Sequence, residues 1–303
     1  ALTSAIMIAA PAAYGDAAPI LDTFAEASEA LGEDILAMVS DGPAEVLNLT
    51  VNTQPVMLTA GVASYRFWQS LGGPAPAMMA GHSLGEYTAL VCAGSLAFAD
   101  AVKLVRLRAE AMQSAVPEGV GAMAAVLGLD DATVRTVCAD AAQGEVLEAV
   151  NFNSPGQVVI AGNKAAVDRG CALAKEKGAK RALPLPVSVP SHCALMKPAA
   201  ERLRAALDGI EVKMPAVPVL HNADVAAYTD PAAIRDALAR QLYSPVRWVE
   251  TVQAMAAQGI ELIAECGPGK VLAGLNKRCA EGVAGVALAD PAAMTDTLAK
   301  IKA

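Results

Sequence analysis

The chain has 303 residues and a formal net charge of −8, and 54% of its residues are hydrophobic but only 4% are aromatic. This length allows one large domain with an insertion, or two domains. The acidic balance excludes a general nucleic-acid binder, which needs a basic face, and the longest apolar runs are shorter than the roughly 20 residues of a membrane span. The alanine-rich composition favours an α/β protein.

The N-terminal stretch, residues 1–13, is apolar but has no basic leader, so we expect no signal peptide. The cysteines show no C-x-x-C pair and no regular spacing. They predict free thiols in a reducing compartment, and therefore a cytoplasmic protein. The six are Cys92, Cys138, Cys171, Cys193, Cys266 and Cys279.

The first third of the chain is predicted to be mostly helical. Apolar residues at helical spacing predict helices over 21–37, 56–71, 86–94 and 100–114, and residues 77–80 predict a short buried strand.

From Gly121 the pattern changes. The expected strands span 122–129, 145–151, 157–161 and 182–187, and the expected helices span 130–142 and 164–177. The order is β-α-β-β-α-β, which is the ferredoxin-like unit. We therefore predict an inserted small subdomain at 117–189, and a large subdomain made of 1–116 and 190–303.

The remaining residues restore the alternation of strands and helices that is typical of a parallel sheet. Helices are expected up to residue 207 and over 234–243, 249–258 and 271–280, and strands over 217–221 and 260–266. The Gly267-Pro268-Gly269-Lys270 turn lacks the spacing of a phosphate-binding Walker loop, so a tight strand-to-helix turn is the favoured interpretation.

The candidate nucleophile is Ser83 in Gly81-His-Ser-Leu-Gly, which joins the expected strand 77–80 to a helix. Glycines on both sides allow a turn sharp enough to leave the serine hydroxyl projecting, as in a nucleophile elbow. The backbone N–H of Leu84, at the positive end of the helix, could donate to a developing oxyanion. The motif also occurs in purely structural turns.

A serine hydroxyl needs a base, and the chain offers three histidines. His82 adjoins Ser83, where neighbouring side chains diverge, so we interpret it as a substrate contact. His192 is expected to open a helix after a strand end in the second half of the large subdomain, and it is the preferred general base. His221 is interpreted as structural. No acidic residue stands out as an orienter of His192, so a Ser-His dyad is sufficient.

Arg108 lies on an otherwise apolar predicted helix. It is either a surface charge, a partner of a nearby acid such as Glu110, or a cation that holds a substrate carboxylate through two parallel hydrogen bonds. The residues alone leave these alternatives open.

Several separated motifs together resemble the bacterial malonyl-CoA:acyl carrier protein transacylases, an acyltransferase family. The similarity runs from about Phe24 to the C-terminus, and the motifs keep the order of the family. They are Gly81-His-Ser-Leu-Gly-Glu-Tyr, Val150-Asn-Phe-Asn-Ser-Pro-Gly-Gln, Val187-Ser-Val-Pro-Ser-His-Cys-Ala-Leu-Met, Gln241-Leu-Tyr-Ser-Pro-Val and Cys266-Gly-Pro-Gly-Lys.

The resemblance implies an α/β-hydrolase-like large subdomain, a ferredoxin-like small one, and malonyl transfer from coenzyme A to the phosphopantetheine thiol of acyl carrier protein in fatty acid synthesis. No cofactor or metal is implied beyond these substrates. By similarity, Ser83 is acylated, His192 is the acid/base held by the backbone carbonyl of Gln241, and Arg108 grips the malonyl carboxylate. The same site is lined in the family by residues that correspond to Gln54, His82 and Asn153.

The chain departs from the family at its start. A G-Q-G-S-Q loop, whose glutamine N–H completes the oxyanion hole, should fall near Ala1 to Ala5, where the sequence is Ala-Leu-Thr-Ser-Ala. This leaves the second oxyanion donor open. Two alternatives remain: a serine esterase or thioesterase that passes the acyl group to water, and a non-catalytic homologue that only binds carrier protein.

An acidic carrier protein must meet a local basic patch on this acidic chain. The candidates are Lys180-Arg181 and Lys277-Arg278, which otherwise are ordinary solvated charges. We expect a monomer.

Overall fold

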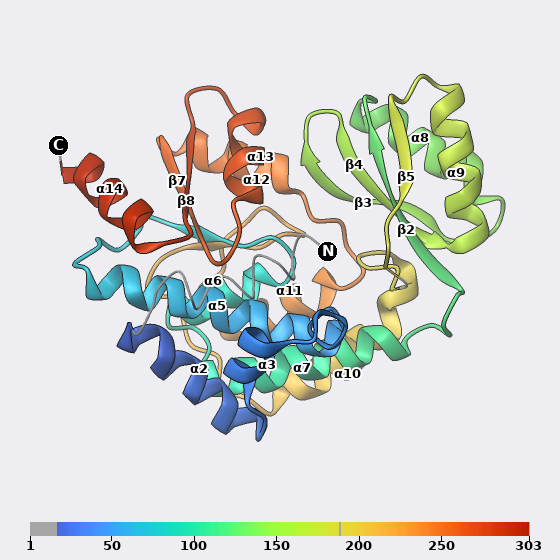
Figure 1. The fold of residues 1–303 in the computed structure, drawn as a ribbon. Coiled ribbons are helices and arrows are strands. Elements are labelled where there is room, and N and C mark those ends of the chain that lie inside the picture. Colours follow the sequence, from blue (N-terminus) through green and yellow to red (C-terminus); the bar gives the residue numbers. More distant parts are fainter. Residues whose placement is uncertain (1–16, 188, 303) are drawn as a thin grey trace.

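The computed structural model describes residues 17–187 and 189–302, which form an α/β fold of mixed helices and sheets. Four helices pack together below the sheets in Figure 1 and bury the largest apolar cluster. They are α2 (Ala18–Leu31), α5 (Thr50–Ser70), α7 (Phe98–Ser114) and α10 (Lys197–Asp208). Each buried leucine- or phenylalanine-sized side chain contributes about 1.5–3 kcal/mol to stability.

The single helix predicted over 21–37 is wrong, because the chain turns at Gly32. This glycine adopts φ 68 and its N–H donates to the carbonyl of Ser28, which ends α2. The side chain of Asp34 then accepts from the N–H of Ala37 and begins a second helix, α3 (Ile35–Asp41). The short α4 (Ala44–Leu47) leads into α5.

A four-stranded antiparallel sheet, with two helices packed against it, forms the part of the chain that we call the four-stranded unit (upper right in Figure 1). Its elements follow in the order β2 (Gly121–Leu127), α8 (Asp131–Ala142), β3 (Leu147–Ser154), β4 (Gln157–Asn163), α9 (Lys164–Glu176) and β5 (Arg181–Pro184). The sheet order is β3-β4-β2-β5, so both central strands, β4 and β2, are buried between neighbours. Asp130 caps α8 by accepting from the N–H of Thr133.

Strand β3 is irregular, and the irregularity connects this unit to the rest of the chain. Its register against β4 shifts between Ala149 and Asn151 and again between Phe152 and Ser154. Its free edge pairs instead with Val246, whose N–H donates to Val150 and whose carbonyl accepts from Phe152. The segment that follows α11 (Pro231–Gln241) is thereby hydrogen-bonded to the edge of β3.

Two parallel strand pairs make up the other sheets of the described residues. β1 (Met79–Ala80) pairs with β6 (Val219–Leu220), and β7 (Leu262–Cys266) pairs with β8 (Ala284–Leu288). The predicted parallel pairing is present, but in the described part of the chain it forms two separate two-stranded sheets. The strands at 77–80 and 217–221 are shorter than expected.

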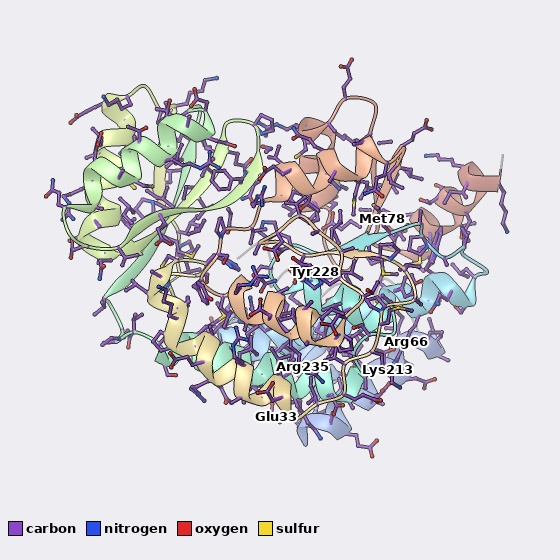
Figure 2. The ribbon with its side chains drawn as sticks, turned by 180° about the vertical axis from the view of Figure 1, so that it is seen from behind. Glu33, Arg66, Met78, Lys213, Tyr228 and Arg235 are labelled. Atoms are coloured by element: carbon purple, nitrogen blue, oxygen red, sulfur yellow. The ribbon has the colours of Figure 1, made fainter. Side chains whose placement is uncertain are left out.

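The remaining helices are α6 (Gly85–Cys92), α12 (Trp248–Ala257), α13 (Val271–Cys279) and α14 (Pro291–Lys302), with a 3-10 turn at Ala194–Met196. Neither β8 nor α14 was predicted. Arg235 of α11, which Figure 2 labels, donates to the carbonyls of Leu207 and Ile210 and so connects α11 to the end of α10.

All six cysteines are free thiols. Every helix among the described residues is too short or too polar to cross a bilayer.

Candidate active site

The loop after β1 has the geometry of a nucleophile elbow. Ser83 adopts φ 51, a left-handed conformation that costs a non-glycine residue energy and is found mainly at functional sites. A Cβ on Gly81 would overlap the backbone of Gly85, so only glycine fits there. Helix α6 begins at Gly85, with Leu84 as its N-cap, which places the Leu84 N–H at the positive end of the helix.

The pairing of β1 with β6 brings two distant loops together. Because the strands are parallel, their carboxyl ends meet at one edge, with Gly81 to Ser83 beside His221 and Asn222. Asn222 Oδ1 accepts from the N–H of Ser83 at 2.7 Å, and Asn222 Nδ2 donates to the carbonyl of Gly81 at 2.6 Å. The side chain of Asn222 therefore holds both sides of the elbow.

The structure brings Ser83 and His192 together across 109 positions. Ser83 Oγ lies 2.8 Å from His192 Nε2, and His192 Nδ1 lies 2.9 Å from the backbone carbonyl oxygen of Gln241. Since a carbonyl can only accept, Nδ1 carries the proton and Nε2 is free to accept the serine proton. The prediction that His192 begins a helix is wrong. His192 lies in a turn with φ 65, before the 3-10 segment.

The environment keeps His192 neutral. Burial and then the nearby Arg108 cation lower the pKa of His192 to about 3, although the hydrogen bond to Gln241 acts in the opposite direction. A neutral imidazole is the form that can act as a general base.

Arg108 is 1% exposed and lies beside the serine. Its Nη1 donates to Gln54 Oε1 at 2.7 Å, and its Nη2 donates to Gln241 Oε1 at 3.0 Å and to Ser83 Oγ at 3.2 Å. Within the described residues no carboxylate forms an ion pair with it, so Glu110 is not its partner and it is not a surface charge. Burial lowers the pKa of Arg108, but a guanidinium remains charged in proteins.

Behind the elbow lies a buried carboxylate that we did not predict. Glu86 is fully buried and accepts from the backbone N–H of Asn222 at 2.9 Å and from Gln241 Nε2 at 3.0 Å. His221 Nδ1 lies 2.6 Å from its other oxygen, and the His221 ring is 5.3 Å from that of Tyr228, which Figure 2 labels. His221 contacts Glu86 rather than Ser83. The only sequence signal for Glu86 was its place three residues after Ser83.

His82 and Asn153 connect the elbow to the four-stranded unit. His82 Nε2 lies 2.8 Å from Asn153 Oδ1, and the His82 ring is 5.6 Å from that of Trp248. Asn153 is the extra residue at the second register shift of β3, and such bulges redirect side chains toward sites. Burial lowers the pKa of His82.

The Gly267-Pro268-Gly269-Lys270 turn does not offer an empty anion site. Glu265 Oε2 accepts from the N–H of Ala273, so a carboxylate already occupies the N-terminus of α13. The predicted tight turn is the better interpretation.

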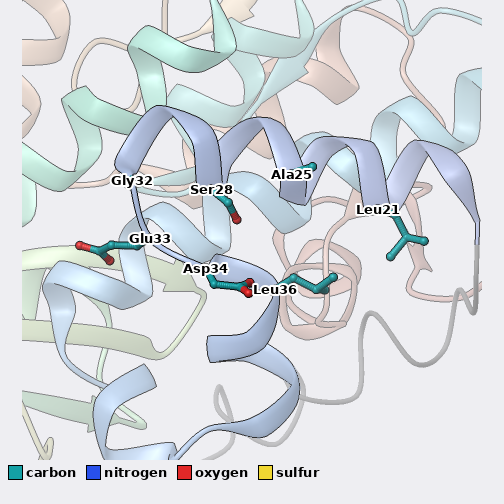
Figure 3. A pocket seen from close by; sticks show the side chains of 7 residues that line it. All are labelled: Leu21, Ala25, Ser28, Gly32, Glu33, Asp34 and Leu36. Atoms are coloured by element: carbon teal, nitrogen blue, oxygen red, sulfur yellow. The ribbon is translucent and has the colours of Figure 1, made fainter.

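A surface pocket of about 460 Å³ lies between α2 and α3 (Figure 3). Its polar groups have partners within the chain, because the Ser28 hydroxyl accepts from the N–H of Ile35, Asp34 caps α3, and Glu33 pairs with Arg106. We assign it no role in the chemistry of Ser83.

The basic residues predicted to bind a partner are all exposed, and Arg278 donates to the carbonyl of Pro155 at 3.3 Å, at the β3–β4 turn. Lys180 and Arg181 lie at the same end of that sheet, since the N–H of Lys180 donates to Leu127 and the N–H of Gly128 donates to Gly156. The glutamine loop expected near residues 1–5 lies outside the described residues.

Comparison with known proteins identifies the family. A family model described as an acyl transferase domain matches residues 16–293. The malonyl CoA-acyl carrier protein transacylase of Escherichia coli (strain K12) is 62% identical over 281 residues, which cover 92% of this chain and 91% of that protein. The solved acyl-carrier-protein S-malonyltransferase from Burkholderia pseudomallei 1710b is 59% identical with a TM-score of 0.94, covering 97% of this chain and 94% of its own.

A further solved structure, a type II PKS acyl-carrier protein in complex with its malonyl-transacylase, is 53% identical with a TM-score of 0.94, covering 96% of this chain and 95% of its own. The match of the family model over most of the chain agrees with the order of the motifs around Ser83 and His192. This chain belongs to the acyl transferase domain family.

Proposed function

We propose that this protein transfers a malonyl group from coenzyme A to the phosphopantetheine thiol of an acyl carrier protein, through a malonyl ester of Ser83. The observation that carries the proposal is the position of Arg108, a buried cation that no carboxylate of the described residues contacts directly. Its Nη2 lies 3.2 Å from Ser83 Oγ, which lies 2.8 Å from Nε2 of a neutral histidine, His192. The relatives that cover nine-tenths of the chain are named for this transfer.

In the first half-reaction, His192 Nε2 takes the proton from Ser83 Oγ as the oxygen attacks the thioester carbonyl. The oxyanion receives a hydrogen bond from the N–H of Leu84, at the N-terminus of α6. When this intermediate collapses, the C–S bond breaks and the imidazolium gives its proton to the departing coenzyme A thiolate. The product is the malonyl-Ser83 ester.

The second half-reaction reverses these roles. The phosphopantetheine thiol gives its proton to His192 Nε2 as its sulfur attacks the ester carbonyl, and the C–O bond to Ser83 then breaks. The serine oxygen takes the proton back, so the enzyme returns to its starting state. The Gln241 carbonyl holds the imidazole in one tautomer throughout, because it accepts from Nδ1.

Arg108 makes the site selective for an acyl group that carries a carboxylate. A guanidinium can hold a carboxylate through two parallel hydrogen bonds, and an acetyl group would leave its buried charge unpaired. We place His82 and Asn153 at the edge of the same site, where they contact the thioester substrates.

The test is intact-protein mass spectrometry after mixing with malonyl-CoA. The proposal expects a mass increase of one malonyl group, located on Ser83 by peptide mapping and lost in Ser83→Ala. Adding holo-acyl carrier protein should discharge the ester onto the carrier thiol. Rapid release of free malonate without carrier protein would instead indicate a hydrolase, and carrier-protein binding with no adduct would indicate a non-catalytic homologue.

We also propose that Lys180, Arg181, Lys277 and Arg278 dock the acidic carrier protein. Their exposure, and the position of Arg278 beside the end of the sheet where Lys180 lies, support this assignment. Lys277→Glu with Arg278→Glu should slow discharge of the ester onto carrier protein by about tenfold, but not formation of the ester from malonyl-CoA. We propose that the enzyme acts as a cytoplasmic monomer.

We propose that the four-stranded unit is a ferredoxin-like subdomain at residues 117–189, inserted into an α/β-hydrolase-like subdomain formed by 1–116 and 190–303. The strand order β3-β4-β2-β5 with antiparallel pairs supports the first assignment. The elbow between β1 and α6 supports the second.

A further inference from the structure

The two terminal nitrogens of Arg108 are both held by glutamine side chains. Gln54 Oε1 accepts from Nη1 at 2.7 Å, and Gln241 Oε1 accepts from Nη2 at 3.0 Å. Gln54 is 7% exposed and Gln241 is fully buried. Amide oxygens orient the guanidinium but do not neutralise it, whereas a carboxylate in either place would form a closed ion pair.

The Glu86 carboxylate does lie nearby, but the side-chain amide of Gln241 stands between it and the guanidinium of Arg108. Gln241 Nε2 faces three acceptor oxygens, at 2.9 Å from the carbonyl of Ser83, 3.0 Å from Glu86 Oε2 and 3.4 Å from Asn222 Oδ1. These acceptors fix which end of the amide points away from Arg108, so the oxygen must face the cation. Glu86 therefore attracts the Arg108 cation electrostatically, without a direct hydrogen bond to it.

Gln54 has no such restriction on its nitrogen. Gln54 Nε2 donates to Thr50 Oγ1 at 3.1 Å and to Met112 Sδ at 3.7 Å. A threonine hydroxyl can donate as well as accept, and sulfur makes only a weak hydrogen bond. A glutamate at position 54 would therefore meet no fixed acceptor, while the same change at position 241 would place a carboxylate among three oxygens.

We propose that Gln54 determines acyl selectivity through its neutrality: it holds Arg108 in place and leaves the guanidinium charge open for the carboxylate of the acyl group. A carboxylate at position 54 would pair with the guanidinium internally, and the site would then lose much of its preference for malonyl over neutral acyl groups. This inference rests on the proposed function.

The test compares Gln54→Glu with Gln54→Met, using initial rates of Ser83 acylation from malonyl-CoA and from acetyl-CoA. Gln54→Glu should lower the malonyl-to-acetyl ratio by at least about tenfold, because the substrate carboxylate must displace an internal one. Gln54→Met loses the hydrogen bond but adds no charge, so it should still prefer malonyl. Gln69→Glu, the same change on the exposed end of α5, is the matched control and should leave the ratio unchanged.

If Gln54→Glu keeps the malonyl-to-acetyl ratio of the wild type, or if Gln54→Met lowers that ratio equally, neutrality at position 54 is not the determinant. A second measurement does not depend on the folding of Gln54→Glu: free malonate, but not its dimethyl ester, should protect Ser83 of the wild type and of Gln54→Met from a serine-directed sulfonyl fluoride. Absence of protection would overturn the proposal. A wild type that forms no malonyl-Ser83 ester would instead refute the proposed function.

Discussion

Arg108 and Arg240 show two ways in which this chain uses a guanidinium. Arg240, on α11 and partly exposed, is paired by Asp224 at 2.8 and 2.7 Å and by Asp236 at 2.6 Å. Its pKa is raised, first by the hydrogen bond to Asp224. Arg108 is more deeply buried, yet only uncharged oxygens accept its hydrogen bonds among the described residues, and burial lowers its pKa.

The comparison separates structural arginines from candidate binding arginines. A buried charge without a counter-charge costs several kcal/mol, so a fold keeps one only where a ligand supplies the missing charge or where positioning depends on it. Arg240 needs no ligand, because two carboxylates already surround it. Arg108 has no carboxylate of the described residues paired directly with it, so a substrate carboxylate can be its counter-ion.

The largest expected effect is on Arg108 itself. Arg108→Ala should slow acylation of Ser83 by malonyl-CoA about a hundredfold or more, and acylation by acetyl-CoA much less, since only malonyl loses its counter-charge. Arg240→Ala is the control and should leave the ratio of the two rates unchanged. Equal losses for both substrates in Arg108→Ala would remove the distinction between the two arginines.

Gln241→Met should produce a smaller loss. It removes the amide that holds Arg108 but keeps the main-chain carbonyl that accepts from His192 Nδ1. We expect malonyl transfer to fall by about tenfold, mainly through KM, while acetyl transfer keeps its kcat. An equal fall in kcat for both substrates would show that the side chain is needed to align the base.

The next prediction concerns pH. The base acts in its neutral form, and the pKa of His192 is about 3, so inactivation of Ser83 by a neutral sulfonyl fluoride should keep a constant rate from about pH 8 to about pH 5. Because the Arg108 cation contributes to this low pKa, Arg108→Ala should raise it and move the acid limb to higher pH. An unchanged profile in the variant would mean that burial alone sets the pKa.

The smallest effect is expected at Asp224. Arg240 and Tyr228 hold its pKa below the usual range, so its contribution to stability is present at neutral pH and is lost as the pH falls through the lowered pKa. Asp224→Asn should cost about 0.5–1 kcal/mol in urea unfolding at pH 7, less in high salt, and nothing at low pH. A change in acylation rate would contradict the structural assignment.

Much of the local structure could be predicted from the sequence, because it depends on short-range effects. Gly81 and Gly85 around Ser83 indicated the elbow, since the turn needs glycine at Gly81 whatever surrounds it. The order of strands and helices between Gly121 and Pro184 followed from alternating apolar residues. Gly32 and the capping residue Asp34 also indicate the break after α2, but the apolar residues at helical spacing on both sides predict one continuous helix.

The charge state of the site could not be predicted, because it depends on contacts between residues far apart in the chain. Sequence pattern left Arg108 open between three roles, and its partners Gln54 and Gln241 lie 54 and 133 positions away. The resemblance supplied a role for Gln241, but the sequence analysis assigned no role to Glu86, which follows Ser83 in the same motif. The pairing of β1 with β6 brings Asn222 to Glu86, and the end of α11 brings Gln241 to it.

By itself, therefore, the sequence determined which residue types stand at each turn, cap and strand, since backbone conformation is decided by near neighbours. The tertiary structure decided which of these residues are charged, buried and paired with one another. Electrostatic energy depends on the distance between charges in space and on the exclusion of water, and the spacing of residues along the chain predicts neither.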